Sequence, residues 1–170
     1  MILVGIGSNL AAPGFALPRE TAAAAVAQLP QLGIAVRRIS HWYLSEPVPA
    51  SDQPWYVNAV AVVETTLSPL GLLDTLLALE VRFGRRRGAP NAARTLDLDL
   101  LDYDGRESAS PRLTLPHPRL HERRFVLVPL SEAAPGWRHP LLGGTAAALL
   151  AALPPGQPIR ALGDSAAPGG

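Results

Sequence analysis

The sequence predicts an α+β sandwich, in which helices pack on one face of an antiparallel or mixed sheet. The chain has 170 residues, of which 48% are hydrophobic and 17% are charged, and this composition suits one domain with one core. Short apolar or alternating runs indicate strands, whereas longer Leu- and Ala-rich runs indicate helices. Their order, strand–helix–strand–strand–helix–strand, is typical of the ferredoxin-like arrangement with a mostly antiparallel sheet.

The first elements of the chain have clear ends. Residues 2–6 form an apolar run that ends at Gly7-Ser8-Asn9, which predicts a buried strand opening into a turn. The Ala-rich residues 19–29 predict a helix that Pro30 and Gly33 end. Residues 34–43 alternate in part and predict a second strand. The three prolines within residues 44–55 predict a loop, and its length is typical of a functional one.

The later elements follow the same rules. Ser68 and Pro69 are typical of a helix cap and a first helical residue, and this helix runs to about Phe83 and stops at Gly84. Further strands are predicted at 56–65, 95–103 and 113–115, and further helices after Pro129 within 122–133 and at 145–153. We expect residues 1–153 to form the domain. We expect the Pro-, Gly- and Ala-rich residues 154–170 to be a flexible tail.

The composition excludes several classes of function. All fifteen basic residues are Arg, so a Walker phosphate loop and a Schiff-base lysine are both absent. There is no Cys for thiol catalysis, disulfides or Cys-based zinc sites. The net charge of +1 argues against nucleic-acid binding, and no run reaches the ~20 apolar residues of a membrane helix. The N-terminus also lacks the pattern of a signal peptide. We expect a cytoplasmic, monomeric protein.

Two carboxylates on one predicted strand are the sharpest functional signal. Asp97 and Asp99 are two residues apart, so they lie on the same face of the strand, opposite Leu96, Leu98 and Leu100. Two neighbouring carboxylates repel each other unless a cation lies between them. Mg²⁺ commonly binds one or two carboxylates together with substrate phosphates. An ordinary solvated strand face is the alternative interpretation.

Several arginines lie close to this acidic pair in the sequence. Arg94 precedes the strand, and Arg85, Arg86 and Arg87 lie on the loop before it. The planar guanidinium matches phosphate oxygens two at a time, so these side chains suit a polyphosphate ligand. A solubilising surface loop is the alternative. Glu80 lies on the apolar stripe of its helix, where it could accept from a ribose hydroxyl or pair with an Arg.

A second group of residues suits a flat heterocycle. Tyr56 and Asn58 share one face of a predicted strand, and Phe125 could close the other side of a bound ring. Core packing is the alternative role for each aromatic residue. His117 lies between two prolines and could donate to a phosphate, although a lone His is more often structural.

Six blocks of residues stand in order along residues 2–140. They are Gly7-Ser8-Asn9-Leu10, residues 52–58 (DQPWYVN), Glu80 with Gly84-Arg85-Arg86-Arg87, residues 94–99 (RTLDLD), residues 115–119 (LPHPR) and residues 123–130 (RRFVLVPL). With these blocks in this order, the chain resembles the 6-hydroxymethyl-7,8-dihydropterin pyrophosphokinase family. The loop lacks the Trp that some members have, and residues 90–93 (PNAA) stand in its place.

The resemblance implies an enzyme that transfers diphosphate from ATP to the pterin hydroxymethyl group and releases AMP in folate biosynthesis. It implies two Mg²⁺ ions held by Asp97 and Asp99, with Arg85 and Arg94 as further catalytic residues. The ATP contacts that it implies are Glu80, Arg87, Leu100, His117 and Arg123, and the pterin contacts are Ser45, Val48, Tyr56, Asn58 and Phe125.

Three other functions remain as alternatives. A different Mg²⁺-dependent phosphotransferase or nuclease could use the same acidic pair without any pterin. A ferredoxin-like RNA-binding module would present paired aromatics on a basic sheet face, where this chain has Asp97 and Asp99. An inactive relative is the third alternative, and the intact aspartates and arginines argue against it.

Overall fold

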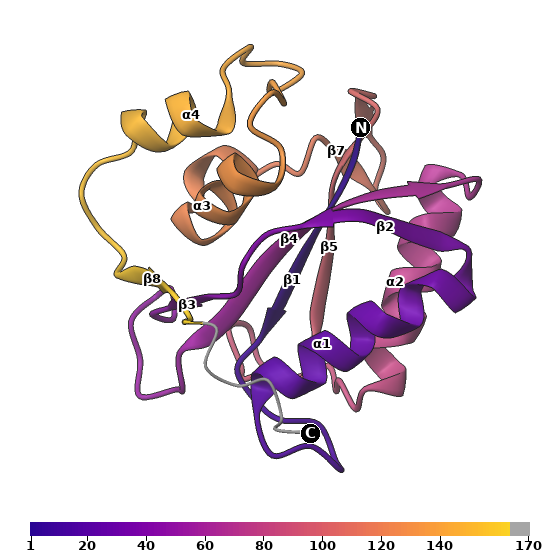
Figure 1. Cartoon of the computed structure of the whole chain (residues 1–170), viewed down its shortest axis with the longest axis vertical. Helices are drawn as coiled ribbons and strands as arrows, with labels where there is room; N and C mark the ends of the chain where they lie inside the picture. The colour runs from indigo at the N-terminus through magenta and orange to yellow at the C-terminus, as the bar shows by residue number, and fades with distance from the viewer. Residues whose placement is uncertain (164–170) are drawn as a thin grey trace.

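One antiparallel sheet forms the centre of the molecule. The computed structural model describes residues 1–163, and its main sheet has the order β5-β1-β4-β3-β8, with β2 pairing along the same edge of β4 as β3 (Figure 1). A two-stranded sheet, β6-β7, lies apart from it. The strands are β1 (Ile2–Ser8), β2 (Ile34–Ile39), β3 (Tyr43–Ser45), β4 (Tyr56–Thr65), β5 (Asp97–Tyr103), β6 (Ser108–Ala109), β7 (Thr114–Leu115) and β8 (Ile159–Ala161).

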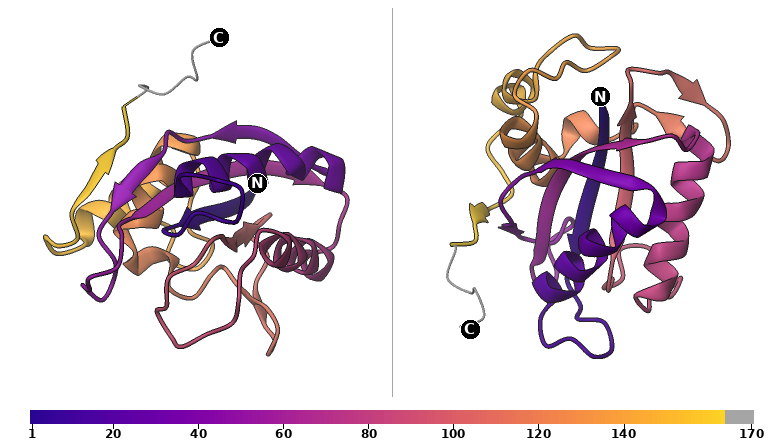
Figure 2. Two further views of the ribbon diagram at one scale, coloured as in Figure 1. Left: turned by 90° about the horizontal axis from the view of Figure 1, so that it is seen from below. Right: turned by 45° about the vertical axis from the view of Figure 1, so that its right-hand side comes forward.

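Helices cover both faces of the sheet, which corrects the prediction of one covered face (Figures 1 and 2). Helices α1 (Pro18–Gln28) and α2 (Pro69–Arg82) pack on one face, and α3 (Arg124–Ala133) and α4 (Ala146–Ala152) on the other. Short 3₁₀ helices lie at Leu29–Leu32 and Leu120–Glu122. The strands are apolar on both sides, because Leu3, Val60 and Leu101 form a second core with α3 and α4. The α+β class is confirmed.

A serine divides the strand that was predicted at residues 34–43. The chain forms β2 and β3 instead, with Ser40 between them. The Ser40 N–H donates to the Val60 carbonyl at 3.0 Å, while the Ser40 hydroxyl accepts from the Val60 N–H at 3.1 Å. This side chain therefore replaces a backbone carbonyl in the ladder, and the chain can bend there. Ser45, predicted within the loop, is the last residue of β3.

Helix α3 begins at Arg124 and contains Pro129, so the prediction that the helix follows this proline was wrong. A proline within a helix cannot donate its backbone hydrogen bond. Here the helix buries Val126, Leu127 and Leu130 against the sheet. Burial of three such side chains contributes several kcal/mol, roughly 1.5–3 each, which exceeds the cost of one lost hydrogen bond.

Part of the predicted tail belongs to the sheet. Residues Ile159–Ala161 form β8, which pairs with β3, so the prediction of a flexible tail from residue 154 does not hold for these residues. Residues 164–170 lie outside the described part of the chain. None of the helices within residues 1–163 is both long enough and apolar enough to cross a membrane.

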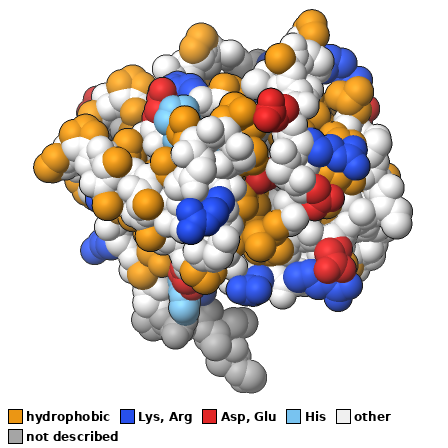
Figure 3. Space-filling model, turned by 90° about the horizontal axis from the view of Figure 1, so that it is seen from above, with side chains coloured by type: hydrophobic (Ala, Val, Ile, Leu, Met, Phe, Trp, Pro, Cys, Tyr) orange, Lys and Arg blue, Asp and Glu red, His pale blue; other side chains and the backbone are white. Residues whose placement is uncertain are grey.

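The surface carries charges of both signs. On the face shown in Figure 3, arginines lie scattered among acidic and apolar side chains, and the described part of this face carries no continuous basic track. This distribution agrees with the net charge of +1.

Candidate active site

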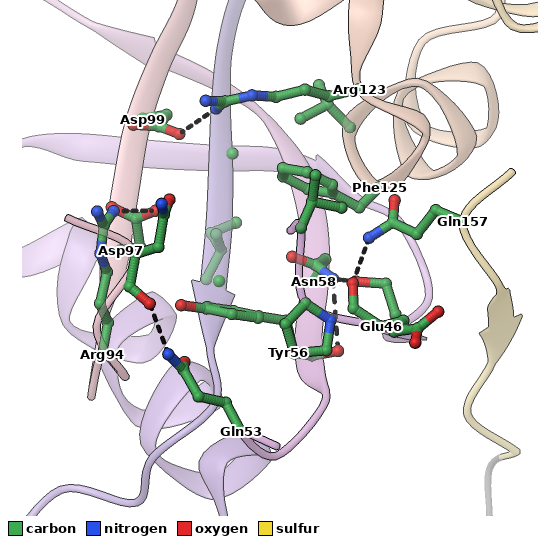
Figure 4. Close-up of a pocket in the computed structure, with 18 of the residues that line it drawn as sticks. Glu46, Gln53, Tyr56, Asn58, Arg94, Asp97, Asp99, Arg123, Phe125 and Gln157 are labelled. Carbon is green, nitrogen blue, oxygen red and sulfur yellow. Dashed lines mark hydrogen bonds and ion pairs between the residues drawn. The ribbon is translucent and has the colours of Figure 1, made fainter. Parts of the chain in front are cut away.

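A cavity lies on the α3 side of the sheet, at the end where β1 finishes and β4 and β5 begin (Figure 4). The antiparallel pairing brings these three strand ends together. All five residues predicted to bind a pterin line the cavity, as do four of the residues predicted for catalysis or ATP binding. These nine are Ser45, Val48, Tyr56, Asn58, Phe125, Arg94, Asp97, Asp99 and Arg123.

The floor of the cavity is formed in part by two glycines of β1. Gly5 and Gly7 lie on the cavity side of the strand, while Val4 and Ile6 point into the opposite core. A Cβ atom at Gly7 would lie 3.4 Å from the Asn58 side-chain oxygen. The absence of a side chain at Gly7 therefore lets Asn58 approach the backbone of β1 closely.

Asp97 is held between two arginines. Its carboxylate accepts from Arg85 Nη1 at 2.9 Å and from Arg94 Nη1 at 3.1 Å. About a quarter of the Asp97 side chain is exposed, so solvent screens these ion pairs only in part. These ion pairs join the Arg-rich loop to the acidic strand.

Asp99 is the less stabilised carboxylate of the pair. Burial, and then the charge of Asp97, raise the pKa of Asp99 to about 7, although Arg123 opposes the shift from a distance of 3.9 Å. Two carboxylates on one face, one of them poorly compensated, form a donor set that suits a divalent cation. Within residues 1–163 no cluster of three or more His, Cys, Asp or Glu side chains suits a metal, so substrate oxygens would complete the coordination.

Glu80 is buried beneath Arg85 and does not line the cavity. Its carboxylate accepts from the Leu98 N–H of β5 at 2.7 Å and pairs with Arg85 Nη1 at 2.5 Å. Burial raises the pKa of Glu80, while the Leu98 N–H and the Arg85 charge oppose this shift. The sequence suggested two partners for Glu80, a ribose hydroxyl or an arginine, and in this structure Glu80 pairs with an arginine. Glu80 thus connects α2, the Arg-rich loop and the acidic strand.

We expect Glu80→Gln to lower the free energy of unfolding by about 1–3 kcal/mol, because a buried acceptor and its charge partner are both affected. Urea titration measures this change. Glu64→Gln is the matched control, since Glu64 pairs with Arg37 on the surface with 64% of its side chain exposed, and we expect a change below about 0.5 kcal/mol. Equal effects of the two substitutions would contradict a structural role for Glu80.

Asn9 fixes the backbone beside Arg94. Its side-chain oxygen accepts from the Arg94 N–H at 2.8 Å, and its own N–H donates to the Arg94 carbonyl at 3.1 Å. The Asn9 amide nitrogen donates to Gln53 and to the Pro54 carbonyl at 3.1 and 3.2 Å. One buried side chain therefore joins the end of β1, the loop before β4 and the start of the acidic strand.

An apolar slot lies beside the charged part of the cavity. Tyr56 and Phe125 are on opposite sides of the slot, and Asn58 lies between them at its inner end (Figure 4). The Asn58 amide donates to Ser45 Oγ at 2.6 Å. Arg123 stacks over the Phe125 ring at 5.5 Å. The slot suits a flat ring with polar edges.

Besides Glu80, three other residues predicted to bind ATP lie outside this cavity. Arg87 is on the exposed part of the loop, and the Leu100 side chain is buried in the core under α2, so only its backbone could contact a ligand. His117 lies along the free edge of β5, where its N–H donates to the Leu101 carbonyl at 2.8 Å. Burial, and then the Arg123 charge, lower the pKa of His117 to about 4, so the imidazole is neutral at pH 7.

The structure adds lining residues that the sequence analysis did not select. Glu46, Gln53 and Gln157 all contribute to the cavity wall. Gln53 belongs to residues 52–58, one of the blocks that carry the family resemblance, so the sequence could have pointed to it. Gln157 lies in the Pro-rich C-terminal segment, and no sequence pattern pointed to it.

Comparisons with known proteins show the family of this chain. Residues 3–135 match the family model of 7,8-dihydro-6-hydroxymethylpterin-pyrophosphokinase. The chain is 44% identical to a Synechocystis 2-amino-4-hydroxy-6-hydroxymethyldihydropteridine pyrophosphokinase over 144 residues, which are 84% of this chain and 71% of the relative. It is 45% identical to the Haemophilus influenzae protein of the same name over 131 residues, covering 77% and 79% of the two chains.

The fold is also shared with solved structures. A Plasmodium falciparum HPPK-DHPS structure with pteroate has a TM-score of 0.63 and 12% identity, and the match covers 88% of this chain. The chain spans about two fifths of that longer protein, 41% of its length. Fold and site together define a small-molecule transferase of the α+β class. More particularly, the chain belongs to the 7,8-dihydro-6-hydroxymethylpterin-pyrophosphokinase family.

Proposed function

We propose that this protein transfers the diphosphate group of ATP to the hydroxymethyl group of 6-hydroxymethyl-7,8-dihydropterin and releases AMP. The observation that carries the proposal is the juxtaposition, in one cavity, of an aromatic slot and an acidic pair surrounded by arginines. Family membership supports the same activity. We also propose that the protein acts as a monomer in the cytoplasm.

The pterin occupies the apolar slot in this proposal. Its ring lies between Tyr56 and Phe125, and its polar edge meets the Asn58 amide and the Ser45 hydroxyl. Val48 covers the outer side of the slot, where its side chain is exposed in the free protein. The hydroxymethyl group then points toward Asp97 and Asp99, because these residues line the other end of the same cavity.

The nucleotide binds along the free edge of β5 in this proposal. Arg123, Arg87 and the neutral His117, as a hydrogen-bond donor, contact its phosphates, and the backbone of Leu100 contacts the base. His117 Nδ1 accepts from the Arg119 N–H at 3.2 Å, so Nε2 carries the proton and can donate. Glu80 acts through Arg85, which it holds next to Asp97.

The transfer itself depends on position and charge. The pterin hydroxyl oxygen forms a bond to the β-phosphorus of ATP and loses its proton to solvent, while the bond from this phosphorus to the α-phosphate oxygen breaks and AMP leaves. Arg85 and Arg94 stabilise the negative charge of the transferring group. Mg²⁺, as two ions at Asp97 and Asp99, would supply further positive charge to the triphosphate when bound there.

The experiment that tests the function is AMP release from ATP and Mg²⁺ with and without 6-hydroxymethyl-7,8-dihydropterin. We expect AMP only when the pterin is present, because the diphosphate needs its hydroxyl acceptor. An ordinary kinase leaves ADP instead. ADP, or AMP formed at the same rate without pterin, would favour a different Mg²⁺-dependent phosphotransferase.

A further inference from the structure

The C-terminal segment of the described chain returns to the slot. The family match ends at residue 135, and α4 and the segment after it lead to β8, far from α3 in the sequence. Strand β8 pairs with β3, with Ile159 opposite Ser45 and Arg160 opposite Leu44. Because Ser45 contacts Asn58 at the inner end of the slot, β8 is attached to the strand that carries the slot.

Gln157 makes a direct contact with the slot wall. Its side chain is half-buried and lines the cavity, and its amide donates to the Glu46 carbonyl (Figure 4). The Glu46 N–H donates in turn to the Pro158 carbonyl at 3.2 Å. Both backbone polar groups of Glu46 are therefore bound by two consecutive residues of the C-terminal segment.

These contacts matter because the wall has few other hydrogen bonds. Glu46, Pro47, Val48 and Pro49 line the slot, and two prolines leave two of these four residues without an N–H. Within residues 1–163, the hydrogen bonds of residues 46–50 go to Gln157 and Pro158. A wall that is held before the ligand arrives binds with a smaller loss of conformational entropy.

We propose that residues 157–160 form part of the pterin slot, with Gln157 as a positioning residue that fixes the Glu46–Pro49 wall and sets the affinity for the pterin. The inference rests on the proposed function of the slot. It assigns no contact with the nucleotide to this segment, because the arginines and the acidic pair lie at the other end of the cavity.

The ladder between β3 and β8 provides a matched pair of variants. The Glu46 N–H bonds to Pro158 and the Leu162 N–H bonds to Trp42, so the hydrogen-bonded positions of β8 alternate as 158, 160 and 162. The Arg160 N–H therefore points toward β3, whereas the Ala161 N–H points away from it. Arg160→Pro removes a ladder bond, and Ala161→Pro introduces the same ring without removing one.

The test is calorimetric binding by the full chain, with Mg²⁺ and a non-hydrolysable ATP analogue, followed by 6-hydroxymethyl-7,8-dihydropterin. We expect Gln157→Met, which keeps the length but loses the donor, to raise the Kd for the pterin about fivefold. Arg160→Pro should raise it about tenfold, and Ala161→Pro should leave it within about twofold of the unchanged protein. The Kd for the ATP analogue should stay within about twofold in all three.

Three results would overturn the inference. Unchanged pterin affinity in Gln157→Met and Arg160→Pro would contradict the positioning role of the segment and would leave the proposed function of the slot intact. Equal losses for both ligands, with a lowered melting temperature, would mean that the segment supports the whole fold rather than the slot. An unchanged protein that binds the ATP analogue but no pterin would refute the proposed function, and this inference with it.

Discussion

Asp97→Asn is expected to lower kcat at least 10²–10³-fold while the protein stays folded. The substitution keeps the shape of the side chain but removes the charge that faces Arg85, Arg94 and the proposed cation site. Asp97 acts through the cations that it holds, and loss of one group that stabilises transition-state charge typically costs about 10²–10³-fold. Pterin-dependent AMP release under saturating substrates measures the change in rate.

Stability is the second readout for this variant. Arg85 keeps its ion pair with Glu80 when the Asp97 charge is removed, and the Asp97 pairs are partly exposed. We therefore expect the free energy of unfolding to fall by no more than about 1 kcal/mol. Near-normal turnover in a folded Asp97→Asn protein would exclude the role that we assign to this carboxylate.

Arg94→Ala is expected to lower kcat about 10³-fold, with a smaller change in the KM for the pterin. An arginine that stabilises charge in phosphoryl transfer contributes roughly 10³–10⁵ to the rate, so this figure is the lower end of that range. Asn9 holds the backbone of Arg94 and not its guanidinium, so the truncated side chain should leave the loop in place. Steady-state kinetics with each substrate varied in turn separates kcat from KM.

Two further variants help to interpret the rate of Arg94→Ala. Arg94→Lys keeps the charge but loses the planar fork, and we expect it to recover only part of the rate. Arg37→Ala is the control, because Arg37 is 60% exposed and pairs with Glu64 on the surface. A rate in Arg94→Ala within about tenfold of the unchanged protein would contradict the catalytic role of Arg94.

Much of the fold follows from local patterns in the sequence. The predicted strand at 56–65 matches β4, and the Ser68-Pro69 signal marks the start of α2, where the Ser68 hydroxyl accepts from the Gly71 N–H. The alternation in 95–103 places Asp97 and Asp99 in the cavity and Leu98 and Leu100 in the core. These features depend on residues that are close in the chain, so the sequence reveals them directly.

The features that were missed depend on distant contacts. Ser40 interrupts a strand because its hydroxyl accepts the Val60 N–H, twenty residues away. Helix α3 includes Pro129 because the second core favours its burial there. Gln157 reaches the slot only because β8 pairs with β3, and a three-residue strand in a Pro-rich segment has no recognisable pattern. The periodic patterns that predict helices and strands contain no information about such distant contacts.

The pairing of Asp97 with Arg85 and Arg94 has a consequence for how a polyphosphate enters the site. The two guanidinium groups are already neutralised in the free protein, so an incoming phosphate meets cations that must first leave a carboxylate. Phosphate binding then replaces the carboxylate as the partner of these arginines, and does not simply add an ion pair to a free cation. Added salt screens the bonds that are lost as well as those that are formed. Affinity should therefore depend on ionic strength less than the number of arginines alone suggests.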